Sequence, residues 1–66
     1  MKNSIKVERA KKNITQAELS KLAEVSRQTI NAIELGKYVP SALLALRLAR
    51  IFETSVEEIF QLEEGE

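Results

Sequence analysis

Small polar residues divide the 66-residue chain into short segments, and within each segment the apolar residues follow a helical rather than an alternating spacing. Small polar side chains begin helices because they accept hydrogen bonds from the free N–H groups of the first turn. Asn13, Gly36 and Pro40 are typical of positions at or just beyond a helix end. No segment has the sustained alternation that a half-buried strand needs. The pattern therefore predicts an all-α fold with five helices, at residues 4–12, 15–23, 26–35, 41–52 and 55–61.

Several of the helix starts carry recognisable capping residues. Thr15 with Glu18, and Ser55 with Glu58, have the spacing of a capping box, in which each side chain bonds to the backbone N–H of the other residue. The remaining N-caps are expected at Ser26, at Ser41 and, for the first helix, at Asn3 or Ser4.

Two of the predicted helices follow each other with almost no connection. The first ends near Ala23, two residues turn the chain, and Ser26 begins the second. A turn this short sets two helices at a steep angle instead of as an antiparallel hairpin. The residues expected to pack between these helices are Leu19, Ala23, Ile30 and Ile33, with Val25 in the turn.

The helix at 26–35 has two chemically different faces. At about 100° per residue, Ile30 and Ile33 fall about 300° and 240° from Arg27, within one apolar arc. The other arc carries Arg, Gln and Asn near the helix start, and these side chains hydrogen-bond base edges in DNA. This arc is therefore a candidate surface for reading nucleic acid. Its members are Arg27, Gln28, Asn31, Ala32 and Leu35.

The formal net charge is zero, but the charges are segregated along the chain. Residues 1–50 hold all ten Lys and Arg residues and four Glu, a net charge of +6, whereas residues 51–66 hold the other six Glu and no cation, a net charge of −6. This distribution fits a basic body that binds a polyanion, with the acidic end held away from it. It fits equally a helical domain with an acidic tail, so charge does not choose between the two.

Composition argues against an enzyme. The chain has no His and no Cys, which removes the usual bases, nucleophiles and soft metal ligands, and it implies no metal site or cofactor. A chain this short hardly encloses a substrate pocket, and no small-molecule ligand is evident. Its core is only marginally self-sufficient, which leaves a partner subunit as the available means of stabilisation. No apolar run approaches the ~18 residues of a membrane span, so we expect a cytoplasmic protein that does not bind membranes.

Taken together, the segments resemble the Cro and phage-repressor type of helix-turn-helix domain, also called the XRE-like family. The resemblance spans residues 5–60. It implies a compact, lambda-repressor-like bundle of five helices whose third helix enters the DNA major groove. The motifs that carry it are Ile14–Leu19, Val25–Ile30, Ile33–Tyr38, Pro40–Ser41, Leu48–Ala49 and Ser55–Phe60.

The resemblance assigns the reading of bases to the start of the helix at 26–35. Arg27 suits O6 and N7 of guanine, and Gln28 suits N6 and N7 of adenine. The alternative for both is the ordinary role of a polar residue on a helix surface. Further candidates are Thr29, Asn31 (for a base or a phosphate) and Ala32 (for a thymine methyl).

Phosphate contacts are expected from Gln16, Lys37 and Tyr38. Gln16 begins a helix, where free N–H groups favour an anion, and in the family this glutamine binds phosphate and braces the reading helix. Lys37 lies in the loop after the reading helix. Tyr38 either adds its hydroxyl to a phosphate or packs against the next helix.

Arg9 and Glu34 occupy positions that form an ion pair in the family, joining the first helix to the third. We expect this pair to be partly buried and structural, so that removal of one partner leaves an uncompensated charge.

Two turn positions depart from the family pattern. Glu24 and Glu53 stand where the family usually has Gly, in turns that call for a left-handed backbone. A residue other than Gly costs about 1–2 kcal/mol in that conformation. We therefore expect Glu24 and Glu53 either to be strained or to lie in locally altered turns.

The helix at 41–52 is apolar nearly all round, with Arg47 and Arg50 its only polar residues after Ser41. One small core covers one face of such a helix, and the rest is available to a second subunit. We expect the core face to be Ala42, Ala45, Leu46, Ala49 and Phe52. We expect the dimer interface to be Leu43, Leu44 and Ile51, with Phe60 and Leu62 alongside.

We interpret the chain as a helix-turn-helix domain at 1–61 followed by an acidic tail at 62–66. The predicted function is that of a sequence-specific regulator of transcription, with repression as its favoured activity, which binds double-stranded DNA as a homodimer. Its operator would have two-fold symmetry, with half-sites about 34 Å apart. The alternative is a protein-interaction module on the same fold, such as an antitoxin or anti-repressor partner.

Overall fold

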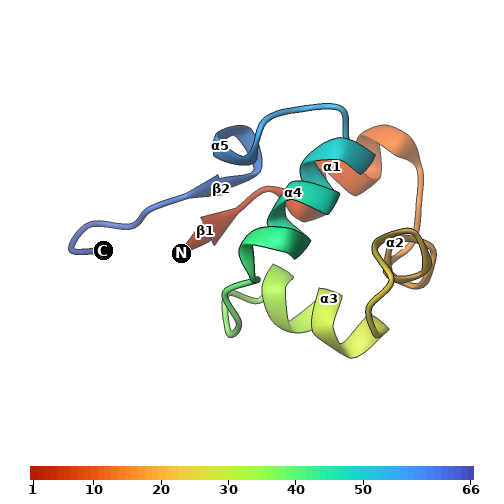
Figure 1. The fold of residues 1–66 in the computed structure, drawn as a ribbon, viewed down its shortest axis with the longest axis horizontal. Helices are drawn as coiled ribbons and strands as arrows, with labels where there is room; N and C mark the ends of the chain where they lie inside the picture. The colour runs from red at the N-terminus through yellow and green to blue at the C-terminus, as the bar shows by residue number, and fades with distance from the viewer.

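The computed structural model describes all of residues 1–66 and contains the five predicted helices together with one short pair of strands. The all-α prediction is confirmed. Figure 1 shows α4 crossing the middle of the molecule, α3 along its lower edge, α2 at one end, and the strands with both chain termini at the other. The helices are α1 (Ile5–Lys12), α2 (Gln16–Ala23), α3 (Arg27–Glu34), α4 (Ala42–Ile51) and α5 (Val56–Ile59), and the strands are β1 (Lys2–Asn3) and β2 (Phe60–Gln61).

Most of the helices begin at the predicted caps. Thr15 forms a complete capping box with Glu18, in which its hydroxyl accepts from the Glu18 N–H and the Glu18 carboxylate accepts from the Thr15 N–H, both at 3.0 Å. Ser55 forms only half of its predicted box, because its hydroxyl accepts from the Glu58 N–H and the return bond is missing. The hydroxyls of the simple caps also accept from the residue three positions further on, at Ser26 and Ser41.

Asn3 and Ser4, the two candidate caps of the first helix, have different roles. Ser4 is the N-cap by position, but its hydroxyl donates to the Glu58 carbonyl at 3.1 Å instead of capping the helix. The side-chain oxygen of Asn3, Oδ1, accepts from the Ile5 N–H at 3.3 Å and caps α1 in its place. The start of α1 is thereby fastened to α5.

The strand pair was not expected from the sequence. β1 and β2 pair antiparallel, with Lys2 opposite Gln61 and Asn3 opposite Phe60. The prediction carried the last helix to residue 61, whereas α5 ends at Ile59 and the chain becomes extended at Phe60. Two-residue strands are too short to show alternation, so the pattern of the sequence carried no sign of them.

A single apolar core fills the space between the helices. Leu19 and Ala23 of α2 meet Ile30 and Ile33 of α3 there, as predicted, and Val25 in the turn is half-buried. α2 also packs against α4, and α4 packs against α5. The complete core consists of Ile5, Leu19, Ala23, Ile30, Ile33, Leu44, Ala45, Leu48, Ala49, Phe52, Ile59 and Phe60.

The predicted orientation of α4 is wrong in part. Leu46 was assigned to the core and is 62% exposed, and Ala42 is exposed as well. Leu44 was assigned to the dimer interface and is buried against the core. A helix that is apolar nearly all round has no polar face to fix its rotation, so packing against α2 and α5 decides which stripe is buried. Ala45, Ala49 and Phe52 are buried as predicted, Ile51 is half-buried and Leu43 is exposed.

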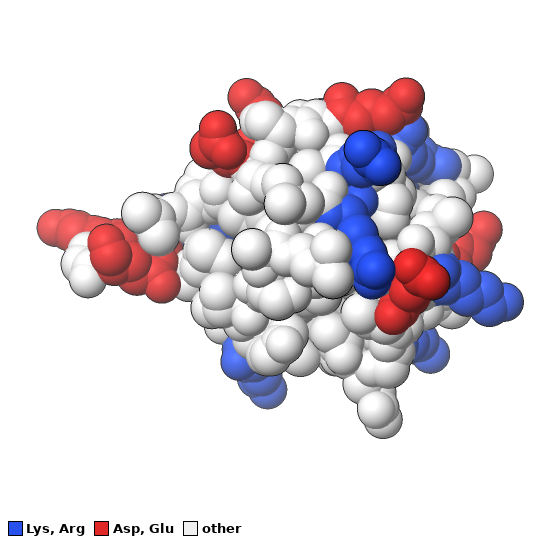
Figure 2. Space-filling view, viewed as in Figure 1, with Lys and Arg blue, Asp and Glu red and all other residues white.

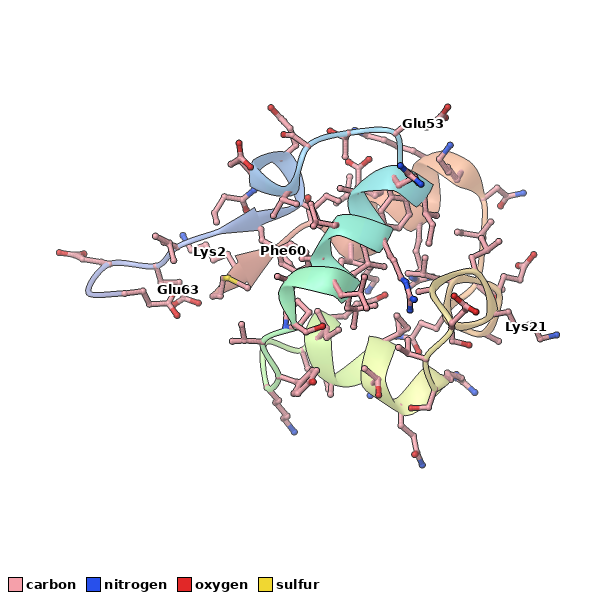
Figure 3. The ribbon with its side chains drawn as sticks, viewed as in Figure 1. Lys2, Lys21, Glu53, Phe60 and Glu63 are labelled. Carbon is pink, nitrogen blue, oxygen red and sulfur yellow. The ribbon has the colours of Figure 1, made fainter.

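The expectation that Phe60 is exposed is also wrong. Phe60 is the first residue of β2, and its side chain is buried in the core. Figure 3 shows Phe60 between the strand pair and α4. The extended backbone of β2 turns this side chain inward and the next one outward. Leu62 is highly exposed, as expected.

Three helices end on a left-handed residue that is not glycine. Asn13 ends α1 with φ 56°, Glu24 ends α2 with φ 61°, and Glu53 follows α4 with φ 55°. Of the two expectations for Glu24 and Glu53, a strained left-handed backbone or a locally altered turn, the structure shows the left-handed backbone. Each glutamate makes an ion pair with a different helix: Glu24 lies 3.6 Å from Arg47 of α4, and Glu53 lies 2.9 Å from Lys12 of α1. None of the helices is both long and apolar enough to span a lipid bilayer.

Candidate nucleic-acid interface

Hydrogen bonds back to the last turn of α2 fix the turn between α2 and α3. Glu24 adopts the left-handed conformation, and the Val25 N–H then donates to the Ser20 carbonyl at 3.0 Å. Ser20 itself is buried, and its hydroxyl donates to the Ala17 carbonyl at 2.7 Å. With its apolar side chains buried in the core, α3 presents its polar arc outward.

The exposed arc of α3 forms a shallow hollow with the start of α2. Gln16, Arg27, Gln28 and Asn31 line this hollow, which we call the α3 hollow. The side chains of Arg27 and Gln28 are exposed and form no hydrogen bond or ion pair within the chain, so their donors and acceptors are available to a partner. Arg27 and Gln28, the two principal base-reading candidates, thus lie beside Asn31, a further candidate.

Two other base-reading candidates are less available. The Thr29 hydroxyl lies 2.9 Å from the Ser26 hydroxyl at the N-cap, and Thr29 is half-buried. Ala32 is half-buried too and offers only its methyl group. Their contact with bases stays a prediction.

A second and larger hollow lies next to the first, between α1, the start of α2 and the start of α3. Three cations line it, Lys6, Arg9 and Arg27, together with Asn13 and Gln16. The first-turn N–H groups of a helix have no partner within the helix and carry partial positive charge. Arg9 is paired with Glu34, so this surface combines the two unpaired cations Lys6 and Arg27 with the start of α2, an arrangement that suits a phosphate backbone.

Arg9 and Glu34 form an ion pair between α1 and α3. Arg9 Nε lies 2.7 Å from Glu34 Oε2, and Arg9 Nη2 lies 3.1 Å from Oε1, so the contact is bidentate. Arg9 also donates to the Ile14 carbonyl at 3.1 Å. The side chains are only 16% and 8% exposed. Hydrogen bonding to the Glu34 carboxylate raises the pKa of Arg9 above its ordinary value, against the smaller opposing effect of burial.

Gln16 connects this ion pair to the α3 hollow. Its amide nitrogen donates to Glu34 Oε1 and to Asn31 Oδ1, both at 3.2 Å. Both amide hydrogens are therefore used inside the chain, which fits the bracing role better than a phosphate contact from the side chain. The backbone N–H of Gln16, at the start of α2, remains free for an anion.

The loop after α3 leaves Lys37 and Tyr38 exposed. Gly36 has φ 75°, and the N–H groups of Gly36 and Lys37 donate back to the last turn of α3, to Ile33 and Ala32, at 2.9 Å each. Tyr38 is 49% exposed, so packing against α4 does not bury it. Phosphate contacts from these two residues stay predictions.

Sequence reasoning missed the part that Asn3 plays in fastening α3. Its amide nitrogen donates to the Ile33 carbonyl at 2.8 Å, at the end of α3, while its oxygen caps α1. β1 thus fastens the C-terminal end of α3, as Arg9 fastens the adjacent residue. An isolated Asn before a helix gives no signal for a contact thirty residues away.

The C-terminal tail, residues 62–66, lies away from α2, whereas Glu53 pairs with Lys12 at the end of α1. Figure 2 shows acidic side chains at the tip formed by the C-terminal tail, and Figure 3 places Glu63 at that end and Lys21 of α2 at the opposite one. The Met1 ammonium lies 3.2 Å from Glu63 and 3.1 Å from Glu66, so the tail is fastened to the start of β1.

The chain matches a helix-turn-helix family model over residues 5–59. It is 52% identical, over the whole length of both chains, to an uncharacterized HTH-type transcriptional regulator of Methanocaldococcus jannaschii. It is 47% identical, over 97% of each chain, to the uncharacterized HTH-type transcriptional regulator YgzD of Bacillus subtilis. A third such regulator, from Archaeoglobus fulgidus, is 48% identical over the whole of this chain and 93% of its own length. With the motif, the fold and these relatives in agreement, the chain belongs to the XRE-like helix-turn-helix family of HTH-type transcriptional regulators.

Proposed function

We propose that this protein recognises a specific sequence in double-stranded DNA by placing α3 in the major groove, and that it represses transcription there as a homodimer. The observation that carries the proposal is the α3 hollow, in which Arg27 and Gln28 are exposed with no partner inside the chain. A helix with free Arg and Gln at its first turn and an apolar opposite face is suited to reading base edges.

The surroundings of the α3 hollow supply the means to hold a DNA backbone. Lys6 and the start of α2 lie on one side of α3, and Lys37 lies in the loop at its other end. Phosphate contacts of this kind supply most of the affinity and its salt dependence, while base contacts choose the sequence. Occupation of an operator that overlaps a promoter is enough to exclude RNA polymerase, which makes repression the simplest outcome.

Exposed apolar side chains support the homodimer. Leu43 is 60% exposed and Leu62 is 73% exposed, and the half-buried Ile51 belongs to the same helix as Leu43. Leu46 joins this set, whereas Leu44 and Phe60 leave it because they are buried. Two copies also fit a DNA site of two-fold symmetry, with one reading helix in each half-site.

Selection from a random duplex library tests the proposal. We expect enrichment of a palindrome with half-sites about 34 Å apart. Arg27→Ala should lose about 1–3 kcal/mol of binding free energy and relax the preference at one base pair in each half-site. Lys37→Ala should weaken binding to all sequences alike and reduce the salt slope by about one. Lys21→Ala, which removes a cation outside both hollows, is the matched control and should change neither.

Failure to enrich any sequence would contradict sequence-specific binding. If Arg27→Ala and Lys37→Ala behaved identically across a panel of duplexes, the division between base and phosphate contacts would be wrong. Sedimentation at high micromolar concentration tests the homodimer, and a 7.4 kDa monomer under those conditions would exclude it.

A protein-interaction module, such as an antitoxin or anti-repressor partner, is the second candidate. It is favoured by a groove on α4 lined by Leu43, Leu46, Arg47 and Arg50, which is separate from the α3 hollow. The same library distinguishes the candidates, because a pure interaction module enriches no sequence.

A further inference from the structure

A continuous series of side-chain hydrogen bonds runs from the interior of the molecule to the α3 hollow. Arg9 of α1 donates twice to Glu34 of α3, at 2.7 and 3.1 Å. Gln16 of α2 donates to Glu34 and to Asn31, at 3.2 Å each. Asn31 is exposed and lines the hollow, whereas Arg9 and Glu34 are largely buried. The series therefore connects the least exposed polar pair of the protein to its candidate reading surface.

The chemistry of each residue in this series fixes the orientation of the next. A guanidinium is only a donor, and an ionised carboxylate is only an acceptor. Glu34 therefore requires the nitrogen of the Gln16 amide, not its oxygen, to face it. The same nitrogen faces Asn31, so Asn31 must present its oxygen to Gln16. The two ends of an amide have nearly the same shape, and only their hydrogen-bond partners distinguish them. Here a buried ion pair decides the orientation of both amides.

The orientation of Asn31 has a consequence for what it offers to DNA. With its oxygen engaged by Gln16, the group that remains for a partner is the NH₂, which donates. Recognition of adenine by Asn uses the oxygen and the nitrogen together, against N6 and N7. If the Asn31 amide turned over to present its oxygen outward, its two hydrogens would face those of Gln16 and the bond between them would be lost.

We propose that Asn31 reads a guanine, whose major-groove edge offers two acceptors and no donor, and that Gln16 is the positioning residue that sets this preference. The inference rests on the proposed function, since it names the base class read at one position of the same surface. Asn31 lies one helical turn after Arg27, on the same arc, so the guanine would neighbour the base pair that Arg27 contacts.

Selection from random duplexes, followed by binding titrations on single-base variants of the selected site, tests the inference. Asn31→Ala should remove the preference at one base pair in each half-site, and in the wild-type protein that pair should be G·C. We expect the wild type to favour G·C over A·T there by about tenfold, as one good base contact provides. Gln16→Met, which keeps the length of the side chain but has no donor, frees the Asn31 amide to turn. The discrimination should then fall to about threefold or less.

Two further variants guard against an indirect effect of Gln16→Met on folding. Asn31→Asp changes an exposed residue, keeps an oxygen for Gln16 and presents no donor, so it should abolish the preference for G·C. Gln28→Met is the matched control, since Gln28 lines the α3 hollow without a hydrogen bond to Asn31 or Gln16. It should alter a different base pair and leave the discrimination at the Asn31 position intact. Thermal unfolding of each variant confirms that it is folded at the assay temperature.

The outcomes separate this inference from the proposed function. A wild-type protein that enriches no sequence contradicts the proposed function itself. A specific wild type in which the Asn31-dependent pair is A·T overturns the inference, and so does a Gln16→Met variant with unchanged discrimination. If Asn31→Ala weakens all sequences equally, Asn31 contacts a phosphate and not a base, which also overturns it.

Discussion

The bidentate pair between Arg9 and Glu34 makes a quantitative prediction about stability. Arg9→Met leaves the Glu34 carboxylate, 8% exposed, with the amide of Gln16 as its only remaining side-chain donor. Glu34→Leu leaves the Arg9 cation, 16% exposed, with the Ile14 carbonyl as its only partner. A buried charge without its partner costs about 3–5 kcal/mol. We expect about 3 kcal/mol for Glu34→Leu, since water reaches Arg9 more easily, and somewhat more for Arg9→Met.

The double variant Arg9→Met with Glu34→Leu should be far less damaging than the sum of the two. No charge remains buried, and the principal cost is the Ile14 carbonyl without a donor, about 1–3 kcal/mol. Replacement of a buried ion pair by apolar residues of similar volume is often neutral or stabilising, which offsets part of that cost. The coupling free energy from the double-mutant cycle should therefore reach at least about 3 kcal/mol in favour of the pair.

Thermal unfolding followed by circular dichroism is the assay for this cycle. For a domain of this size each kcal/mol shifts the Tm by about 4–8 °C, so each single variant should lose at least about 12 °C. A domain of 66 residues has only about 3–10 kcal/mol of total stability, and a stabilising osmolyte keeps the single variants measurable. Single variants that each lose less than about 1 kcal/mol, or a double variant as unstable as the sum, would refute the assignment of a buried structural pair.

Three further predictions concern the turns and the chain ends. Glu24→Gly and Glu53→Gly should each raise stability by about 0.5–1 kcal/mol, because relief of the left-handed strain exceeds the entropy that Gly adds to the unfolded chain; a lower Tm would contradict strain at these turns. Removal of Glu63–Glu66 should strengthen binding to random-sequence DNA at low salt, measured by fluorescence anisotropy, and an unchanged affinity would argue against repulsion by the tail. The Met1 ammonium donates hydrogen bonds to Glu66 and Glu63, which raise its pKa above the ordinary 8.0. The Glu66 carboxylate accepts from the Glu63 N–H and from Met1, which lowers its pKa below the ordinary 4.5. The contact between the tail and the start of β1 should thus be complete between these two pH values. It should be lost as the pH rises through the raised pKa of Met1, and also as the pH falls through the lowered pKa of Glu66. NMR signals of the tail that stay constant in a titration through both pKa values would contradict this contact.

The helices could be predicted from the sequence because the residues that start each helix act within a few positions of one another. A hydroxyl that accepts from the N–H three residues later needs no tertiary structure, which is why Thr15, Ser26 and Ser41 mark their helices correctly. The rotation of α4 could not be predicted, because Leu44 and Leu46 are chemically alike and only packing separates them. The strand pair depends on contacts between distant parts of the chain, and nothing in the structure explains the missing half of the capping box at Ser55.

In the candidate site too, features set by local sequence could be predicted and features set by tertiary packing could not. The exposed arc of α3 follows from helical periodicity, and the partnership of Arg9 with Glu34 was available only through the family resemblance. The donation by Gln16 to two acceptors at once could not be predicted, because it depends on how α2 crosses α3. The same holds for Asn3, whose side chain bridges the ends of two helices.

The absence of internal partners for Arg27 and Gln28 bears on how proteins of this family diverge. A substitution at either position breaks no side-chain hydrogen bond or ion pair of the folded chain, so related proteins can change these two residues at little cost in stability. Asn31 and Glu34 belong to the hydrogen-bonded series that reaches Arg9, and a change there alters packing and surface together. In a set of related sequences, positions 27 and 28 should therefore vary independently of the rest, whereas positions 9, 16, 31 and 34 should change together or not at all.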